Sequence, residues 1–72
     1  MPEKLKLLYD IFKQAINGER EAQKMYQDAI ALCEDNTTIQ TLEKLLKDEM
    51  RHEEKLIEQY NKLKSELQVA ED

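Results

Sequence analysis

Residues 29–46, AIALCEDNTTIQTLEKLL, contain the point at which one helical pattern ends and a second begins. At the centre of this stretch, the four residues at 34–37, EDNT, favour turns over helix interiors. Thr37 and Gln40 then have the three-residue spacing of a capping box, which marks the first turn of a helix. The sequence therefore predicts two helices joined by a turn at about residues 34–37.

A seam with alternating steps of three and four residues runs along each predicted helix. The first seam consists of Leu5, Leu8, Phe12, Ala15, Glu19, Ala22, Tyr26, Ala29 and Cys33. The second seam consists of Ile39, Leu42, Leu46, Glu49, Glu53, Leu56, Tyr60, Leu63, Leu67 and Ala70. We expect an all-α antiparallel hairpin, with helices at about residues 3–33 and 38–69.

The composition supports this fold class and excludes several functions. The 72 residues suffice for one small domain, residues 1–72, and one Gly, one Pro and no Trp are typical of long helices rather than of a sheet. The net charge of −5 disfavours binding to nucleic-acid phosphates, so we expect no nucleic-acid partner. No run approaches the roughly 20 apolar residues of a membrane span, so we expect no membrane partner.

The chain start and the cysteine usage indicate where the protein works. Residues 1–4, MPEK, precede no apolar segment, so we expect no signal peptide. The single cysteine, Cys33, cannot form a disulfide within the chain. This usage is typical of a reducing compartment, and we expect the protein to be cytoplasmic.

The apolar stripes are wider than those of a two-stranded coiled coil, because further residues flank each seam. One hairpin leaves one side of each stripe in water, and a chain this small buries little apolar surface alone. We therefore expect a homodimer in which two hairpins form a four-helix bundle. The flanking residues are Tyr9, Ile16, Gln23 and Ile30 on the first helix and Leu45, His52 and Gln59 on the second.

Three carboxylates interrupt the seams: Glu19 in the first, Glu49 and Glu53 in the second. An ionised carboxylate in a core costs several kcal/mol unless another group compensates its charge. Glu19 lies sixteen residues before position 35 and Glu49 fourteen after it, so an antiparallel hairpin places them at nearly the same height. His52 follows Glu49 by three residues and therefore projects from the same face.

In a dimer, a twofold axis at this height gathers four glutamates and two histidines, which is the ligand set of a carboxylate-bridged dinuclear metal site. Hard oxygen donors suit iron and Mn(II), and carboxylates can bridge two ions. The pattern alone leaves an alternative from another class. Glu19, Glu49 and His52 could set the register of a structural hairpin that binds a partner helix without metal.

Residues 18–22, GEREA, with Tyr26 two turns after Glu19, and residues 48–52, DEMRH, resemble the ferritin-like superfamily, and rubrerythrins in particular. The chain resembles the encapsulated ferritins more closely than the rubrerythrins; these are half-ferritins of two helices that complete a di-iron site only when they dimerise. The resemblance extends over almost the whole chain and depends on spacing more than on any one motif. It implies two irons per dimer, as Fe(II) and Fe(III), with manganese as an alternative metal.

The resemblance also implies roles for individual residues. Glu19 would chelate or bridge iron, Glu49 would bridge, and His52 would be a terminal ligand. Tyr26 would lie beside the metal, either packed in the core or acting as a one-electron donor. For Glu53 the residues leave two interpretations: it orients His52 or a bound water, or it turns out to solvent.

A second set of iron-binding carboxylates lies on the outer surface of related ferritins, near the first ligand. Glu21 is the candidate for such a role in this chain, whereas Gly18 supplies no carboxylate next to Glu19. The encapsulated ferritins carry a targeting tail, and this chain ends at 68–72 with QVAED, without an apolar extension. Enclosure in an encapsulin shell is therefore not supported by this chain.

The resemblance implies ferroxidase activity, in which O2 or peroxide oxidises Fe(II) at a site formed across the dimer. This activity would serve iron detoxification or storage, and storage would need a higher oligomer of dimers or a surrounding shell. A rubrerythrin-like peroxide reductase is the neighbouring possibility. That reaction would depend on an external electron donor, because the chain has no Cys-x-x-Cys pair for a rubredoxin centre.

Overall fold

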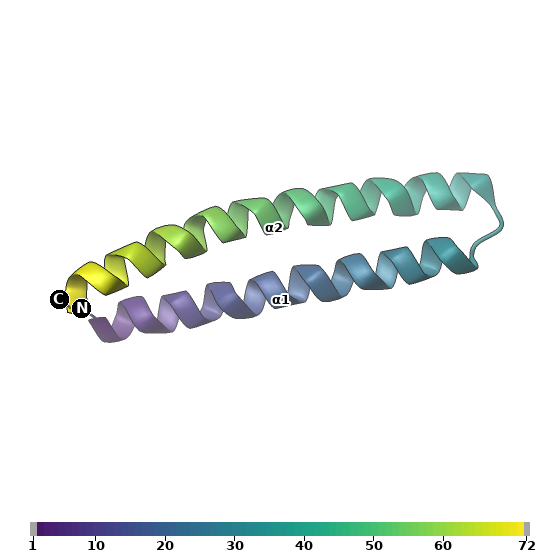
Figure 1. Cartoon of the computed structure of the whole chain (residues 1–72). Coiled ribbons are helices and arrows are strands. Elements are labelled where there is room, and N and C mark those ends of the chain that lie inside the picture. Colours follow the sequence, from purple (N-terminus) through teal and green to yellow (C-terminus); the bar gives the residue numbers. More distant parts are fainter. Residues whose placement is uncertain (1, 72) are drawn as a thin grey trace.

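A computed structural model describes the backbone of residues 2–71 and the side chains of residues 3–68. Helix α1 (Pro2–Leu32) and helix α2 (Asn36–Glu71) run antiparallel, and the start of α1 lies beside the end of α2, away from the turn (Figure 1). The described residues contain no strand, so the predicted all-α hairpin is confirmed. Ala70, the last residue of the expected second seam, lies outside the described side chains.

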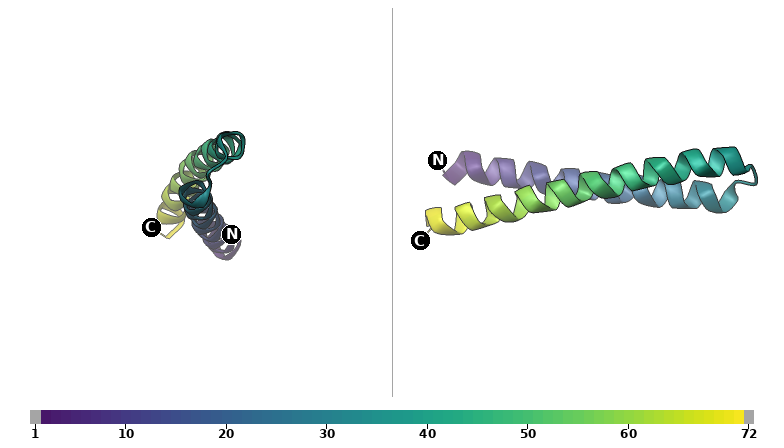
Figure 2. Two further views of the ribbon diagram at one scale, coloured as in Figure 1. Left: turned by 90° about the vertical axis from the view of Figure 1, so that its right-hand side faces the viewer. Right: turned by 90° about the horizontal axis from the view of Figure 1, so that it is seen from above.

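The two helices cross at a shallow angle along a molecule of 55 × 14 × 13 Å (Figure 2). Along the contact between them, Ile16 and Leu63 are the buried apolar side chains among those described. Most other seam residues are half-buried, because a single neighbouring helix covers only one side of each. No helix in the described part of the chain is long and apolar enough to span a membrane.

Asp35 is the N-cap of helix α2 and lies two residues before Thr37, the cap that the sequence pattern predicted. Asp35 Oδ2 accepts hydrogen bonds from the backbone N of Thr38 at 2.9 Å and from its Oγ1 at 2.6 Å. The Asp35 carbonyl accepts from Ile39 N at 2.9 Å, the first backbone bond of α2. The predicted capping box at Thr37 is therefore wrong: the short carboxylate of Asp35 reaches the free N–H groups first, and Thr37 lies inside the helix.

Large apolar side chains remain exposed along one flank of α1 that α2 does not cover. Ile11, Met25 and Leu32 are 59%, 62% and 85% exposed, and they are spaced at multiples of seven residues, so they form one column along the helix. Leu8, which the sequence placed in the seam, is also exposed, because α2 does not extend over that side of α1. One hairpin alone therefore leaves an apolar column in water.

Tyr9 and Tyr60 join the helices near the open end of the hairpin. Their rings are stacked, with centroids 4.6 Å apart and planes inclined by 23°. Their hydroxyl groups share a hydrogen bond of 2.5 Å. The sequence pattern places Tyr9 only on the flank of its seam and does not predict this pairing.

We expect Asp35→Ala to lower the melting temperature by roughly 5 °C, because it removes the N-cap of α2. Asp35→Asn is the matched control and should retain most of the stability, since an amide oxygen caps nearly as well. Thermal unfolding followed by circular dichroism measures both. Equal melting temperatures for the two variants would contradict the cap.

The same residue predicts a pH dependence. Its hydrogen bonds to the Thr38 hydroxyl and N–H lower the pKa of Asp35 below its ordinary value of 3.8. The carboxylate therefore contributes its stability above about pH 3.8 and loses it as the pH falls through the lowered pKa. Asp35→Asn should lack this part of the acid dependence.

Candidate metal centre

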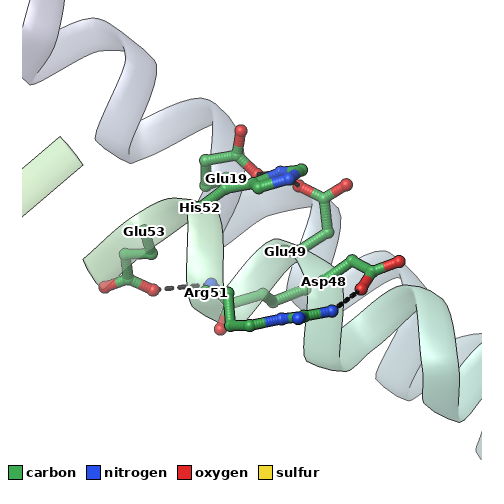
Figure 3. Close-up of polar contacts among 7 residues, drawn as sticks. Glu19, Asp48, Glu49, Arg51, His52 and Glu53 are labelled. Carbon is green, nitrogen blue, oxygen red and sulfur yellow. Dashed lines mark hydrogen bonds and ion pairs between the residues drawn. The ribbon is translucent and has the colours of Figure 1, made fainter. Parts of the chain in front are cut away.

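Glu19 of α1 meets Glu49 and His52 of α2 halfway along the hairpin. The antiparallel arrangement brings the three side chains to one height, and they point toward one another (Figure 3). One ligand atom of each lies within 4.8 Å of the ligand atoms of the other two. The structure thus gathers the three residues that the spacing had singled out as ligands.

The distances within this group are too long for hydrogen bonds. His52 Nδ1 lies 3.8 Å from Glu19 Oε2 and 3.8 Å from Glu49 Oε2. Glu19 Oε2 is sealed from solvent and has no hydrogen-bond partner among the described residues. A buried acceptor in this state costs free energy, and more so when it carries charge. A cation bound between the two carboxylates would offset this cost.

A divalent transition-metal ion fits the group. Carboxylate oxygens and imidazole nitrogens bind such ions at about 2.0–2.2 Å, so the donors of one ion lie at most about 4.2 Å apart. The ligand atoms lie within 4.8 Å of one another, so small side-chain movements would let all three hold one ion. Three donors leave positions open, and two carboxylates match the charge of the ion.

His52 marks the side of the hairpin on which this site opens. Its side chain is 56% exposed, whereas that of Glu19 is 22% exposed. Successive helical residues turn by about 100°, so Gly18 and Arg20 project on opposite flanks of Glu19. Arg20 lies on the flank of Glu53, to which it donates a hydrogen bond. On α2, Glu53 and His52 project on opposite flanks. Gly18, opposite Arg20, therefore lies on the flank of His52. The candidate site and the exposed column of Ile11, Gly18 and Met25 consequently lie on one side.

The opposite flank is tied by hydrogen bonds to Glu53. Arg20 Nε donates to Glu53 Oε2 at 2.9 Å, and Gln23 Nε2 donates to Glu53 Oε1 at 2.5 Å. The Gln23 amide and then the Arg20 guanidinium lower the pKa of Glu53 below its ordinary value of 4.5. Both carboxylate oxygens accept a hydrogen bond from α1, so Glu53 links the two helices.

Two other residues singled out in the sequence lie outside the group. Tyr26 is half-buried on α1, two turns beyond Glu19, and its hydroxyl has no hydrogen bond among the described side chains. Glu21 is exposed on the outer side of α1. Asp48 and Arg51, beside the site, form an ion pair with each other at the surface of α2 (Figure 3).

The hydrogen bonds that the sequence analysis missed differ in how easily they could have been found. Tyr9 lies 26 residues before position 35 and Tyr60 lies 25 after it, so the same counting that paired Glu19 with Glu49 pairs these tyrosines. The link from Glu53 to Arg20 and Gln23 has no such signal. Long side chains can reach several positions on a facing helix, and residue counting does not choose among them.

The fold and the site together define an all-α hairpin that carries a carboxylate–histidine group of metal-ligand type. A family model for the ferritin-like domain matches residues 1–65. The chain therefore belongs to the ferritin-like family, as a two-helix half of the usual four-helix bundle. No curated protein and no solved structure shows a significant match to it.

We expect Glu53→Gln to lower the free energy of unfolding by about 1 kcal/mol, because it weakens two hydrogen bonds between the helices at a partly exposed position. Glu54→Gln is the matched control, since the neighbouring Glu54 is exposed, and it should change stability by less than about 0.5 kcal/mol. Chemical denaturation measures both variants. A Glu53→Gln protein as stable as the control would show that the link contributes nothing.

Proposed function

We propose that the protein is a ferroxidase in which Glu19, Glu49 and His52 bind Fe(II) as substrate for oxidation by O2 or peroxide. The observation that carries this proposal is the sealed, unpartnered Oε2 of Glu19, which lies 3.8 Å from a histidine nitrogen. A purely structural polar contact would be expected to satisfy that oxygen with a hydrogen bond. Membership of the ferritin-like family supports an iron-related role.

Each residue has a distinct part in this function. The two carboxylates offset the positive charge of iron and supply the hard oxygen donors that both Fe(II) and Fe(III) accept. Oxygens of Glu19 and Glu49 that do not face His52 remain free to bind a second ion. His52 supplies a neutral donor at the exposed edge of the group. Bound iron contributes the one-electron redox chemistry, and the protein fixes its position and leaves sites open to the oxidant.

A second copy of the chain would complete the site. One hairpin provides two carboxylates and one histidine, whereas a dinuclear centre in a four-helix bundle uses four carboxylates and two histidines. The exposed column of Ile11, Met25 and Leu32 lies on the same flank as His52, so a partner hairpin that covers the column also covers the site. We therefore propose a homodimer with two irons between its hairpins.

Where the oxidised iron goes depends on whether the proposed dimers assemble into larger oligomers. A two-hairpin bundle fills its centre with side chains and offers no internal volume for a mineral. Service in iron detoxification or storage therefore needs an oligomer of dimers or a separate compartment. Manganese satisfies the same donor set and is the alternative metal in the tests below.

Anaerobic titration of the metal-free protein with Fe(II) tests this proposal. We expect saturation near one iron per chain, and a rise in near-ultraviolet absorbance when air is admitted, because two half-sites hold two irons per dimer. Glu49→Gln should lose this stoichiometric binding, while Glu54→Gln, an exposed change on the same helix, should retain it. Binding no stronger than in the buffer control would contradict the proposal.

A second readout does not depend on oxidation. Glu19→Leu replaces a half-buried carboxylate with an apolar residue, so we expect the metal-free variant to be as stable as the parent or more stable. Fe(II) or Mn(II) should raise the melting temperature of the parent but not of the variant, because a ligand that binds only the folded state stabilises it. Equal melting curves with and without metal for the parent would favour the structural hairpin.

Gly18 tests the proposed dimer. A Cβ at this position meets nothing within 4 Å in the single hairpin, so Gly18→Ala should stabilise an isolated chain by about 1 kcal/mol. A partner helix packed against this flank leaves no such space, and we then expect the substitution to weaken dimerisation at least about tenfold through overpacking.

Asn17→Ala is the matched control for Gly18→Ala. It also raises helix propensity, but Asn17 is exposed on another side of α1, so the dimer should keep its affinity. Analytical ultracentrifugation of the three proteins gives the dissociation constants. A Gly18→Ala protein that dimerises like the parent would place the interface elsewhere.

A further inference from the structure

Tyr9 and Tyr60 form a second chemically distinctive group, about ten residues along each helix from the candidate metal centre. The two rings are stacked at 4.6 Å between centroids, and their hydroxyl oxygens are 2.5 Å apart. Both side chains are half-buried where α1 and α2 approach the open end of the hairpin. This arrangement is independent of Glu19, Glu49 and His52.

The geometry brings the reactive carbons of the two phenols together. The hydroxyl oxygens are closer than the ring centroids, so the rings converge toward their hydroxyl ends. The ortho carbons flank the hydroxyl on each ring, and they are the positions at which two phenoxyl radicals couple. The hydrogen bond shared with Tyr60 raises the pKa of Tyr9 above its ordinary value of 10.0, so Tyr9 is a neutral phenol near neutral pH.

We propose that Tyr9 and Tyr60 are a site of oxidative cross-linking, at which a peroxide converts the pair into an intrachain dityrosine. Each phenol loses one electron and one proton, the two radicals join through a carbon–carbon bond between ortho carbons, and both rings regain their hydroxyl groups. In total two C–H bonds break and one C–C bond forms. Two electrons and two protons pass to the peroxide, whose O–O bond breaks, so that hydrogen peroxide yields two molecules of water.

The cross-link acts as a covalent closure of the open end of the hairpin. The turn at Asp35 joins α1 to α2 at one end, whereas the Tyr9–Tyr60 contact is non-covalent. A bond between these residues closes a loop of about fifty residues and so restricts the unfolded chain strongly. The pair would therefore convert exposure to peroxide into a more stable hairpin.

Tyr26 provides a comparison with the Tyr9–Tyr60 pair within the same chain. Tyr26 is the third of its three tyrosines and has no stacked aromatic partner among the described side chains. Proximity therefore predicts that coupling joins Tyr9 to Tyr60 and leaves Tyr26 unmodified. Random oxidation of accessible phenols would instead involve Tyr26 and produce bonds between chains.

The test uses the full, metal-free chain, so that its outcome does not depend on the proposed ferroxidase. Photo-oxidation with a ruthenium polypyridyl sensitiser removes single electrons from phenols, and peroxodisulfate accepts them. Trypsin then releases Tyr9 in the peptide LLYDIFK, residues 7–13, and Tyr60 in LIEQYNK, residues 56–62. We expect a species at the mass of both peptides less two hydrogen atoms, obtained from protein that migrates as a single chain under denaturing conditions.

Variants assign the bond to its residues. Tyr9→Phe and Tyr60→Phe keep the rings and should each lose the cross-linked species and its dityrosine fluorescence, while Tyr26→Phe should retain both. The cross-linked protein should melt roughly 10 °C or more above the untreated protein. The proposal is overturned if the bond forms mainly between chains, if Tyr26→Phe abolishes it, or if the folded parent yields no more of the 7–13 and 56–62 pair than protein oxidised in denaturant.

Discussion

The carboxylate of Glu19 is the least favourable feature of the single hairpin, and the proposed binding of metal follows from it. It stands in a seam that otherwise packs apolar residues between two helices, and its Oε2 is sealed from solvent without a partner. The Glu49 carboxylate and the His52 imidazole are nearby but do not hydrogen-bond to it. A single chain thus gathers two carboxylates at its centre, and among the described residues no lysine or arginine forms an ion pair with them. This arrangement favours the binding of a cation there.

Contacts elsewhere in the hairpin keep this unfavourable group in place. A helix turns by about 100° per residue, so a rotation of α2 by one position would carry Glu49 and His52 away from Glu19. The Asp35 cap fixes where α2 begins, and the bonds from Arg20 and Gln23 to Glu53 fix which flank of α2 faces α1. The bonds to Glu53 lie on the side away from His52, so they orient the ligands without occupying them.

The sequence predicted the features that follow from periodicity and failed where individual side chains choose among partners. A repeat of 3.6 residues and a rise of 1.5 Å per residue suffice to predict two helices, their seams and the equal height of Glu19 and Glu49. The sequence pattern predicted a cap at Thr37, but Asp is an equally good capping residue, and only the path of the chain decides between positions 35 and 37. The side chain of Glu53 points diagonally to Arg20 and Gln23, a direction that the register of the helices does not reveal.

The exposed column and the candidate site have opposite effects on dimerisation when no metal is bound. Ile11, Met25 and Leu32 favour association because they are apolar, yet association alone would bring the carboxylates of two chains close to one another. Like charges at such a site repel, so apolar contact and electrostatics oppose each other in a metal-free dimer. In the proposed dimer, bound iron attracts the carboxylates of both chains, so that electrostatics favours association instead of opposing it. Iron binding and dimerisation are then coupled by one free energy: bound iron strengthens the dimer, and the dimer binds iron more tightly by the same amount.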